Sequence, residues 1–252
     1  MSGRGRVADY DSVAASYDRR YSVHDYAGVR NALVEFIAGA HSILEVGCGT
    51  GHWVAAIDRS LVAGVEPSSA MIARARAAAP GARLVRARAE RLPWRDSRFD
   101  RVFCINALHH FSDRRQFFSE AKRVLKPGGA VMSVGKDPHA ERDAWWIYDY
   151  FPGTLQIDRD RFAPLGVLRG ELAVAGFAWA ESFECDQIES IRSVDEAFGR
   201  GLIDRAYTSQ LTVLSDEEFQ AGVARIRDAN DAAGGALTLV TDFRLFATVG
   251  WV

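Results

Sequence analysis

The chain has 252 residues and 48% hydrophobic content, enough to bury one full core, so we expect one domain rather than two independent ones. Its formal net charge of −2 provides no basic surplus that would attract nucleic acid or an anionic membrane. Three widely separated cysteines indicate neither a disulfide framework nor a zinc site, and no signal peptide or long apolar run is apparent, so we expect a soluble, cytoplasmic protein.

Two helices are expected before the first strand. Apolar residues recur at helical spacing over residues 9–20 and again over residues 25–37. The first of these segments contains Tyr17, and Tyr21 follows it closely. One interpretation is that these tyrosines are amphipathic surface aromatics with no further role.

A glycine-rich turn follows the first predicted strand. Residues 43–46 form an apolar run with one acid, which fits a buried parallel strand, and Gly47, Gly49 and Gly51 come directly after it. Glycine suits a turn that adopts positive φ and that a ligand must approach closely. A helix over residues 52–59 would aim its first amides at the turn, so the pattern predicts a nucleotide-binding loop.

The spacing of the loop separates its possible ligands. A purely structural turn is one alternative, and a dinucleotide site is another, but the dinucleotide fingerprint G-x-G-x-x-G needs a glycine where His52 stands. Glu45 is also unusual within a strand buried on both faces. The segment E-x-G-x-G-x-G closely resembles the first motif of the class I S-adenosylmethionine-dependent methyltransferases.

The second βα unit supplies another acid. Residues 61–65 read as a strand that ends in Glu66, and Pro67 and Ser68 then start a helix that reaches about residue 79 and carries Met71 in its first turn. An acid at this strand end can accept hydrogen bonds from both ribose hydroxyls, in a dinucleotide fold as well as in a methyltransferase. A solvated terminal acid is the alternative.

The third strand, residues 82–87, leads into A-E-R-L-P-W and then S-R-F-D, which resembles the methyltransferase segment bordering the adenine. Many members of that family have an acid before the alanine, where this chain has Arg88, which cannot accept a hydrogen bond. We therefore look to Glu90 or a backbone carbonyl as the adenine acceptor. The Ala89 amide stays available to an adenine ring nitrogen.

The fourth strand, residues 99–106, is almost continuously apolar and should lie centrally. It ends in N-A-L-H-H-F, and Asp113 then caps a helix that K-P-G-G stops before a fifth strand over residues 130–134. The segment R-V-L-K-P-G-G at this place is the second most specific methyltransferase signature in the chain.

The remainder of the chain matches that family only in outline. Residues 137–162 hold an aromatic cluster with Trp145, Trp146 and Tyr148, which fits either a core patch or the wall of an acceptor pocket. We then expect a helix over residues 163–175, a sixth strand within 177–191, a largely helical excursion over 193–235 with a capping box at Ser215, and an antiparallel last strand over 237–252.

The resemblance implies a fold and an activity. The fold is α/β, a Rossmann-like seven-stranded sheet in a single domain over 1–252, with lid helices in 1–40, a cofactor-binding core in 41–135 and acceptor-site elaborations in 136–252. The activity is methyl transfer from S-adenosylmethionine to a small-molecule acceptor at an O, N or C atom, with no metal, nucleic-acid or membrane partner and with a monomer and a homodimer both open. Two alternatives stand beside it: an inactive binding or regulatory protein of the same fold, and a dinucleotide oxidoreductase.

The resemblance also implies site residues. The segment Y-D-S-V-A-A-S-Y-D resembles the N-terminal lid helix of ubiquinone- and menaquinone-biosynthesis methyltransferases, which places Tyr17 near the sulfonium. His110, or else His109, would act as general base with Asp137 as its orienting partner, although one histidine can simply cap the turn. The expected cofactor contacts are Tyr17, Glu45, Gly47, Gly49, Gly51, Glu66, Met71, Ala89, Glu90 and Asn106.

Overall fold

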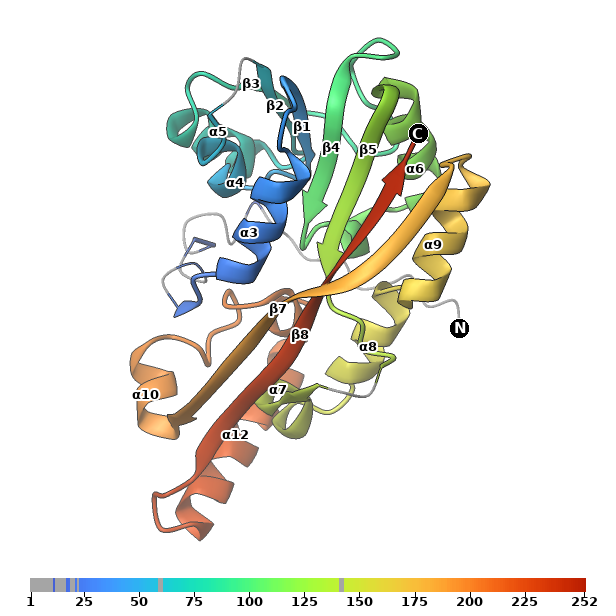
Figure 1. Ribbon diagram of the computed structural model, residues 1–252. Helices are drawn as coiled ribbons and strands as arrows, with labels where there is room; N and C mark the ends of the chain where they lie inside the picture. The colour runs from blue at the N-terminus through green and yellow to red at the C-terminus, as the bar shows by residue number, and fades with distance from the viewer. Residues whose placement is uncertain (1–10, 12–16, 19–20, 22, 59–60, 141–142) are drawn as a thin grey trace.

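A mixed β-sheet organises the computed structural model, which describes residues 11, 17–18, 21, 23–58, 61–140 and 143–252 (Figure 1). The strand order is β3-β2-β1-β4-β5-β8-β6, and β7 pairs with β8. The strands are β1 (Ser42–Val46), β2 (Leu61–Val65), β3 (Arg83–Val85), β4 (Phe99–Ile105), β5 (Leu125–Gly135), β6 (Ala144–Trp145), β7 (Trp179–Ser193) and β8 (Thr238–Trp251).

The pairing directions confirm the predicted architecture. Strands β1 to β5 are mutually parallel where they pair, whereas β8 is antiparallel to β5, β6 and β7. The predicted seven strands are present, and the two-residue β6 is an addition that no sequence pattern announced. The chain passes outward from β1 to β3 and returns to β4 beside β1, so the strand order reverses at this pair. Ligands bind at such reversals in open α/β sheets.

Side-chain caps mark the starts of α5, α6, α10 and α12. Asp113 accepts from the Gln116 amide at 3.0 Å, and Ser215 and Glu218 form the predicted capping box. The predicted helix over 52–59 is shorter, and most of the one predicted over 9–20 lies outside the described residues. The helices are α3 (Ala27–Phe36), α4 (His52–Ala55), α5 (Ser69–Ala78), η1 (Leu108–His110), α6 (Arg114–Val124), α7 (Trp146–Tyr150), α8 (Thr154–Arg161), α9 (Leu165–Val174), α10 (Val194–Gly199), α11 (Ser209–Thr212) and α12 (Asp216–Ala232).

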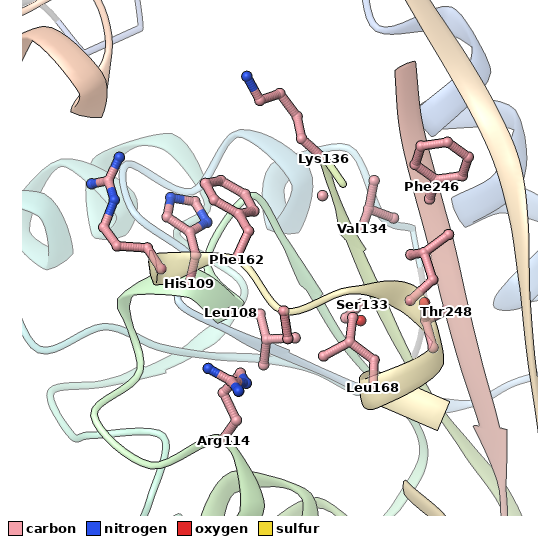
Figure 2. Close-up of a pocket in the computed structure, with 14 residues that line it drawn as sticks. Leu108, His109, Arg114, Ser133, Val134, Lys136, Phe162, Leu168, Phe246 and Thr248 are labelled. Carbon is pink, nitrogen blue, oxygen red and sulfur yellow. The ribbon is translucent and has the colours of Figure 1, made fainter. Parts of the chain in front are cut away.

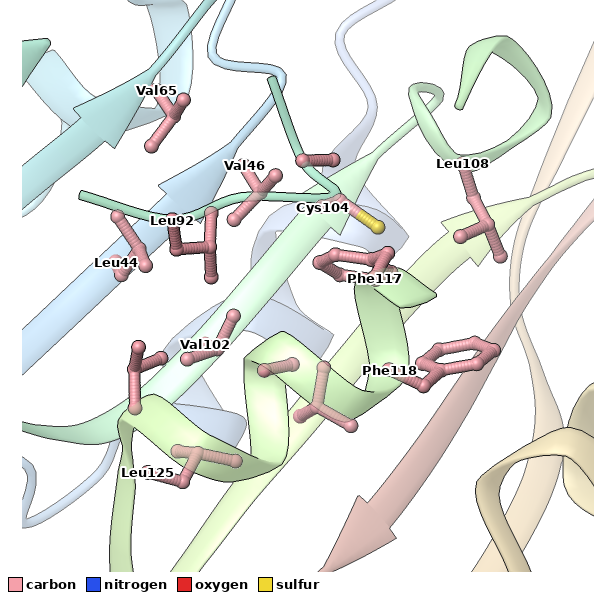
Figure 3. Close-up of a cluster of buried hydrophobic side chains, with 14 of the residues drawn as sticks. Leu44, Val46, Val65, Leu92, Val102, Cys104, Leu108, Phe117, Phe118 and Leu125 are labelled. Carbon is pink, nitrogen blue, oxygen red and sulfur yellow. The ribbon is translucent and has the colours of Figure 1, made fainter. Parts of the chain in front are cut away.

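The two faces of the sheet each bury a core, because side chains alternate along a strand. Leu44 and Val46 of β1 pack on one face with Phe117 and Phe118 of α6 (Figure 3). Ile43 points to the other face, where α3 covers it. The central position predicted for the fourth strand is confirmed, because β4 pairs with β1 on one side and with β5 on the other.

A third core lies against the part of β7 and β8 that extends past the parallel strands. Strands β7 and β8 pair from Trp179 opposite Trp251 to Ser193 opposite Thr238, and their far halves run past the end of β5, where α7, α10 and α12 cover them (Figure 1). The buried side chains there form one cluster, which we call the cap core: Trp145, Trp146, Ile147, Phe151, Val194, Ala197, Leu202, Ile203, Leu211, Leu214, Phe219, Val223, Ile226 and Leu239. The predicted helical excursion is therefore a cap with its own core. Within the described part of the chain, no helix has the length and apolar character needed to cross a bilayer.

The cap core offers a direct test of this packing. A Cβ on Gly222 of α12 would lie 2.2 Å from the Phe151 ring. On Gly170 of α9, a Cβ would meet no described residue within 4 Å apart from its own helix backbone and chain neighbours. We expect Gly222→Ala to lower the free energy of unfolding by about 1–3 kcal/mol through overpacking. Gly170→Ala should raise it by up to about 1 kcal/mol through helix propensity. Urea denaturation followed by circular dichroism measures both, and a Gly222 variant as stable as the Gly170 variant would contradict the packing.

Candidate functional site

The glycine loop, residues 47–51, connects β1 to α4. Its three glycines have φ values of +77°, +52° and +87° at Gly47, Gly49 and Gly51. A Cβ on Gly47 would lie 2.6 Å from the Ala107 side chain, and one on Gly51 would lie 3.0 Å from the backbone of Ala75. At Gly49 the only atom within 4 Å is on the Tyr17 ring, at 3.6 Å, among the described residues. Gly47 and Gly51 are thus required by packing, while Gly49 leaves room beside the backbone for a ligand.

Glu66 lies next to this loop at the end of β2. Its Oε2 accepts from the Gly49 amide at 3.1 Å, and its Oε1 accepts from the Ser68 amide at 2.9 Å. The side chain is 7% exposed, and this burial raises the pKa of the Glu66 carboxyl. Both oxygens keep lone pairs that could accept further hydrogen bonds. Two of the predicted cofactor contacts, Gly49 and Glu66, are therefore brought together.

Glu45 occupies a more enclosed position within β1. It is 1% exposed, and burial raises its pKa well above the usual range. The nearby Glu66 carboxylate also raises this pKa, whereas the hydrogen bond from the Val54 amide lowers it. Its Oε2 has no hydrogen-bond partner among the described residues. A carboxyl in such a place costs least when it is protonated.

The described part of the N-terminal segment covers the glycine loop. Asp18 accepts a hydrogen bond from the Thr50 hydroxyl. The Tyr21 ring stacks on His52 with centroids 3.6 Å apart and planes 3° apart. Together with Tyr17 beside Gly49, these contacts attach the described part of the N-terminal segment to the glycine loop.

The residues expected at the adenine are held by other contacts. Glu90 Oε1 accepts from the Ser112 amide at 2.7 Å, the Ser112 hydroxyl at 2.8 Å and the Asp113 amide at 3.2 Å. It therefore ties the segment after β3 to the start of α6. Met71 and Ala89 are 1% and 5% exposed. Arg88, the residue before Ala89, is exposed.

The end of β4 turns sharply into η1. Asn106 has a φ of +50°, which is uncommon for a residue other than glycine, and its amide donates to the Val134 carbonyl of β5 at 2.8 Å. The turn presents His109 and His110, whose ring centroids lie 3.8 Å apart. Strained backbone of this kind is frequent at functional sites.

Two neighbouring hollows open beside η1, and they share His109, Lys136 and Phe162. The β5–β8 hollow, of about 380 Å³, is shown in Figure 2, where His109 and Phe162 lie side by side; their ring centroids are 4.0 Å apart. The histidine hollow, of about 680 Å³, is lined by His24, Tyr26, Asn106, His109, His110, Lys136, Trp145, Phe162, Tyr207, Thr208, Ser209, Gln210, Phe243 and Leu245.

Asp137 follows β5, as predicted, but its carboxylate binds backbone. Oδ1 accepts from the His139 amide at 3.1 Å, and Oδ2 accepts from the Leu165 amide at 3.2 Å. The structure thus brings His109 and His110 together and directs the Asp137 carboxylate to the loop after β5 and the first residue of α9 instead. Among the described residues, no group of three or more His, Cys, Asp or Glu side chains is placed to hold a metal ion.

Lys136 is a prominent site residue that the sequence analysis missed. Its side chain is 6% exposed, and Nζ lies 2.6 Å from the Tyr148 hydroxyl, 3.5 Å from Asp158 and 4.0 Å from the centroid of the Trp145 ring. Burial lowers the pKa of the ammonium, while Asp158 favours its charged form. The available signal was its position directly after the fifth strand, where parallel strands present ligand-binding residues.

The aromatic segment with Trp145, Trp146 and Tyr148 contributes both to the lining of a hollow and to a buried core. Trp145 lines the histidine hollow and also belongs to the cap core. Trp146 is 4% exposed in the same core, and its ring lies 6.1 Å from that of Phe151. Tyr148 donates its hydroxyl to Asp158 at 2.7 Å.

Comparison with known proteins agrees with this geometry. Residues 44–133 match the family model described as "Methyltransferase domain". The predicted resemblance to class I methyltransferases is confirmed there.

Relatives support the same family. The phthiotriol/phenolphthiotriol dimycocerosates methyltransferase of Mycobacterium tuberculosis is 35% identical over 113 residues, 42% of this chain and 42% of that protein. The demethylmenaquinone methyltransferase of Lactiplantibacillus plantarum is 30% identical over 142 residues, 50% of this chain and 60% of that protein. The chain thus spans less than half the length of the first relative and three-fifths of the second. A putative methyltransferase from an antibiotic biosynthesis pathway of Anabaena variabilis has the same fold, with a TM-score of 0.64, 22% identity and coverage of 98% of this chain and 99% of that one.

The raised pKa of Glu45 predicts a pH-dependent stability. The native state keeps this proton above the unfolded value of about 4.3, so wild-type stability should fall as pH rises from there toward the raised folded pKa. The slope from one group is at most about 1.4 kcal/mol per pH unit. Glu45→Gln cannot titrate and should lose this component, while the exposed Glu217→Gln should keep it. Urea unfolding at pH 5, 6, 7 and 8 measures it, and parallel curves for wild type and Glu45→Gln would refute it.

Proposed function

We propose that this protein transfers a methyl group from S-adenosylmethionine to a small-molecule acceptor held in the two hollows beside η1. The observation that carries the proposal is the pairing of the open Gly49 position with Glu66, at the point where strand order reverses, in a methyltransferase domain. Two relatives, named phthiotriol/phenolphthiotriol dimycocerosates methyltransferase and demethylmenaquinone methyltransferase, support it.

The residues present fit the cofactor. The space beside Gly49 admits a ligand against bare backbone, and Glu66 would hold the ribose diol with its remaining lone pairs. Tyr17 would close over it as part of a lid. The cofactor supplies a methyl group on a sulfonium, which is already a good leaving group. The protein therefore has mainly to hold donor and acceptor in line, about 3–3.5 Å apart, and to exclude water.

A hydroxyl or thiol acceptor must also lose a proton. His109 and His110 both line the histidine hollow, and the His109 ring is stacked on Phe162. We assign the base role to His110, because histidine titrates near neutral pH and this ring is not the one stacked on Phe162. Asp137, with both oxygens on backbone amides, would fix the loop after β5 rather than orient the imidazole.

The ribose assignment can be tested without knowing the acceptor. Glu66→Ala should weaken binding of S-adenosylhomocysteine by about 1.5–3 kcal/mol, the usual size for hydrogen bonds to a charged group. Isothermal titration calorimetry measures the affinity, and Glu181→Ala on exposed β7 is the control. A loss below about 0.5 kcal/mol would move the ribose elsewhere. No binding to the wild type would sink the proposed function itself.

The base role predicts a change in pH dependence. Once an acceptor is found, His110→Gln should lose the acidic limb of the pH–rate profile and turn over at least about 10²-fold more slowly, with unchanged S-adenosylhomocysteine affinity. His41→Gln, at an exposed position before β1, should behave as wild type. An unchanged profile would leave His110 as a structural residue. Cofactor binding without turnover of any acceptor in a broad extract would instead favour a binding or regulatory protein.

A further inference from the structure

The two hollows have a one-sided charge. Three cationic side chains line them, Arg114, Lys136 and Arg161, and three histidines do so as well. Over the described part of the chain, neither lining includes an aspartate or a glutamate. A cleft lined by one sign of charge concentrates ligands of the opposite sign.

Arg161 has unmet hydrogen-bonding capacity in this lining. Its side chain, at the end of α8, is 10% exposed, and Nη2 donates to Asp158 at 2.7 Å. Nε and Nη1 are fully buried and have no partner among the described residues. A buried guanidinium normally satisfies its donors, and its planar fork matches a carboxylate or a phosphate. Arg114 differs, because Glu171 already pairs with it at 3.3 Å.

One buried carboxylate serves both inner cations. Asp158 is 0% exposed and accepts from Tyr148, Gln210 and Arg161, with Lys136 Nζ at 3.5 Å. It therefore cannot fully compensate two charges removed from water.

Asp143 is the other acid that acts on Lys136. Burial raises the pKa of its carboxyl, its Oδ1 accepts from the Arg244 amide, and it lines neither hollow. Arg244 itself is paired with Glu184 and Asp242. Neither Asp143 nor Asp158 lines a hollow, whereas Lys136 and Arg161 both do.

We propose that the methyl acceptor is an acid whose carboxylate or phosphate binds between Arg161 and Lys136, an inference that rests on the proposed function and names its substrate class. Thr208 lines the histidine hollow, and its buried hydroxyl has no partner among the described residues. Lys136 borders both hollows, so an anion held there leaves the rest of the acceptor beside His110 in the histidine hollow. The anion is a handle for position and takes no part in the reaction.

The test compares three probes of similar shape: benzoate, phenyl phosphate and neutral benzamide. Each is titrated by ligand-observed NMR and calorimetry into wild type with and without S-adenosylhomocysteine. At least one anion should bind at least about tenfold more tightly than benzamide, as hydrogen bonds to charged groups predict. Which anion binds better separates a carboxylate from a phosphate acceptor. Equal binding of all three would overturn the inference.

Arg161→Gln should weaken the preferred anion at least about tenfold, leave benzamide unaffected and keep S-adenosylhomocysteine affinity. Arg161→Lys, which retains the charge, should recover part of the loss and serves if the glutamine variant folds poorly. The exposed Arg169→Gln is the matched control. Wild-type anion affinity in both Arg161 variants would also overturn the inference. Failure of S-adenosylhomocysteine to bind would count against the proposed function alone, since the anions are also titrated without it.

Discussion

The structure depends on the parallel pairing of β1 with β4. Residues Ile43 to Glu45 lie opposite Arg101 to Phe103, so the two strands end at the same edge of the sheet. One of these ends becomes the glycine loop and the other becomes the turn through Asn106 into η1. Because the chain reverses its lateral direction between these strands, no crossover helix fills the space above them. A loop suited to a nucleotide and a pair of hollows suited to a second molecule are neighbours for this reason alone.

The parts that sequence predicted are those with local causes. The apolar runs of β2 and β4 could be recognised without reference to distant residues. Asp113 and Ser215 cap the starts of helices, and Gly176 follows the end of one, so each acts on residues within one turn of itself. The neighbourhood of Gly49 and Glu66 followed from the order of the βα units. Even so, the segment after Gly51 forms a single helical turn where periodicity had suggested two.

The parts that sequence could not predict are those assembled from several segments. Lys136 follows β5, Tyr148 belongs to α7, Asp158 and Arg161 to α8, and Gln210 to α11. Each alone is an ordinary polar residue, and no spacing along the chain relates them. Their meeting depends on how the cap helices pack against the paired strands β7 and β8, and the local sequence does not determine that packing. The same holds for Trp145, which lines the histidine hollow as well as joining Trp146 in the cap core.

Strand β8 has a consequence for how the chain reaches this structure. It lies between β5 and β7 and is antiparallel to both, yet it comes far later in the chain than β5. Until it arrives, the edge of β5 from Ala130 to Gly135 presents unpaired peptide groups that could pair with another molecule. Such a long-range pairing is slow to form. During synthesis, β5 therefore keeps an unpaired edge until β8 has been made. This edge can pair with other nascent chains and cause aggregation, a risk that ends once β8 is in place.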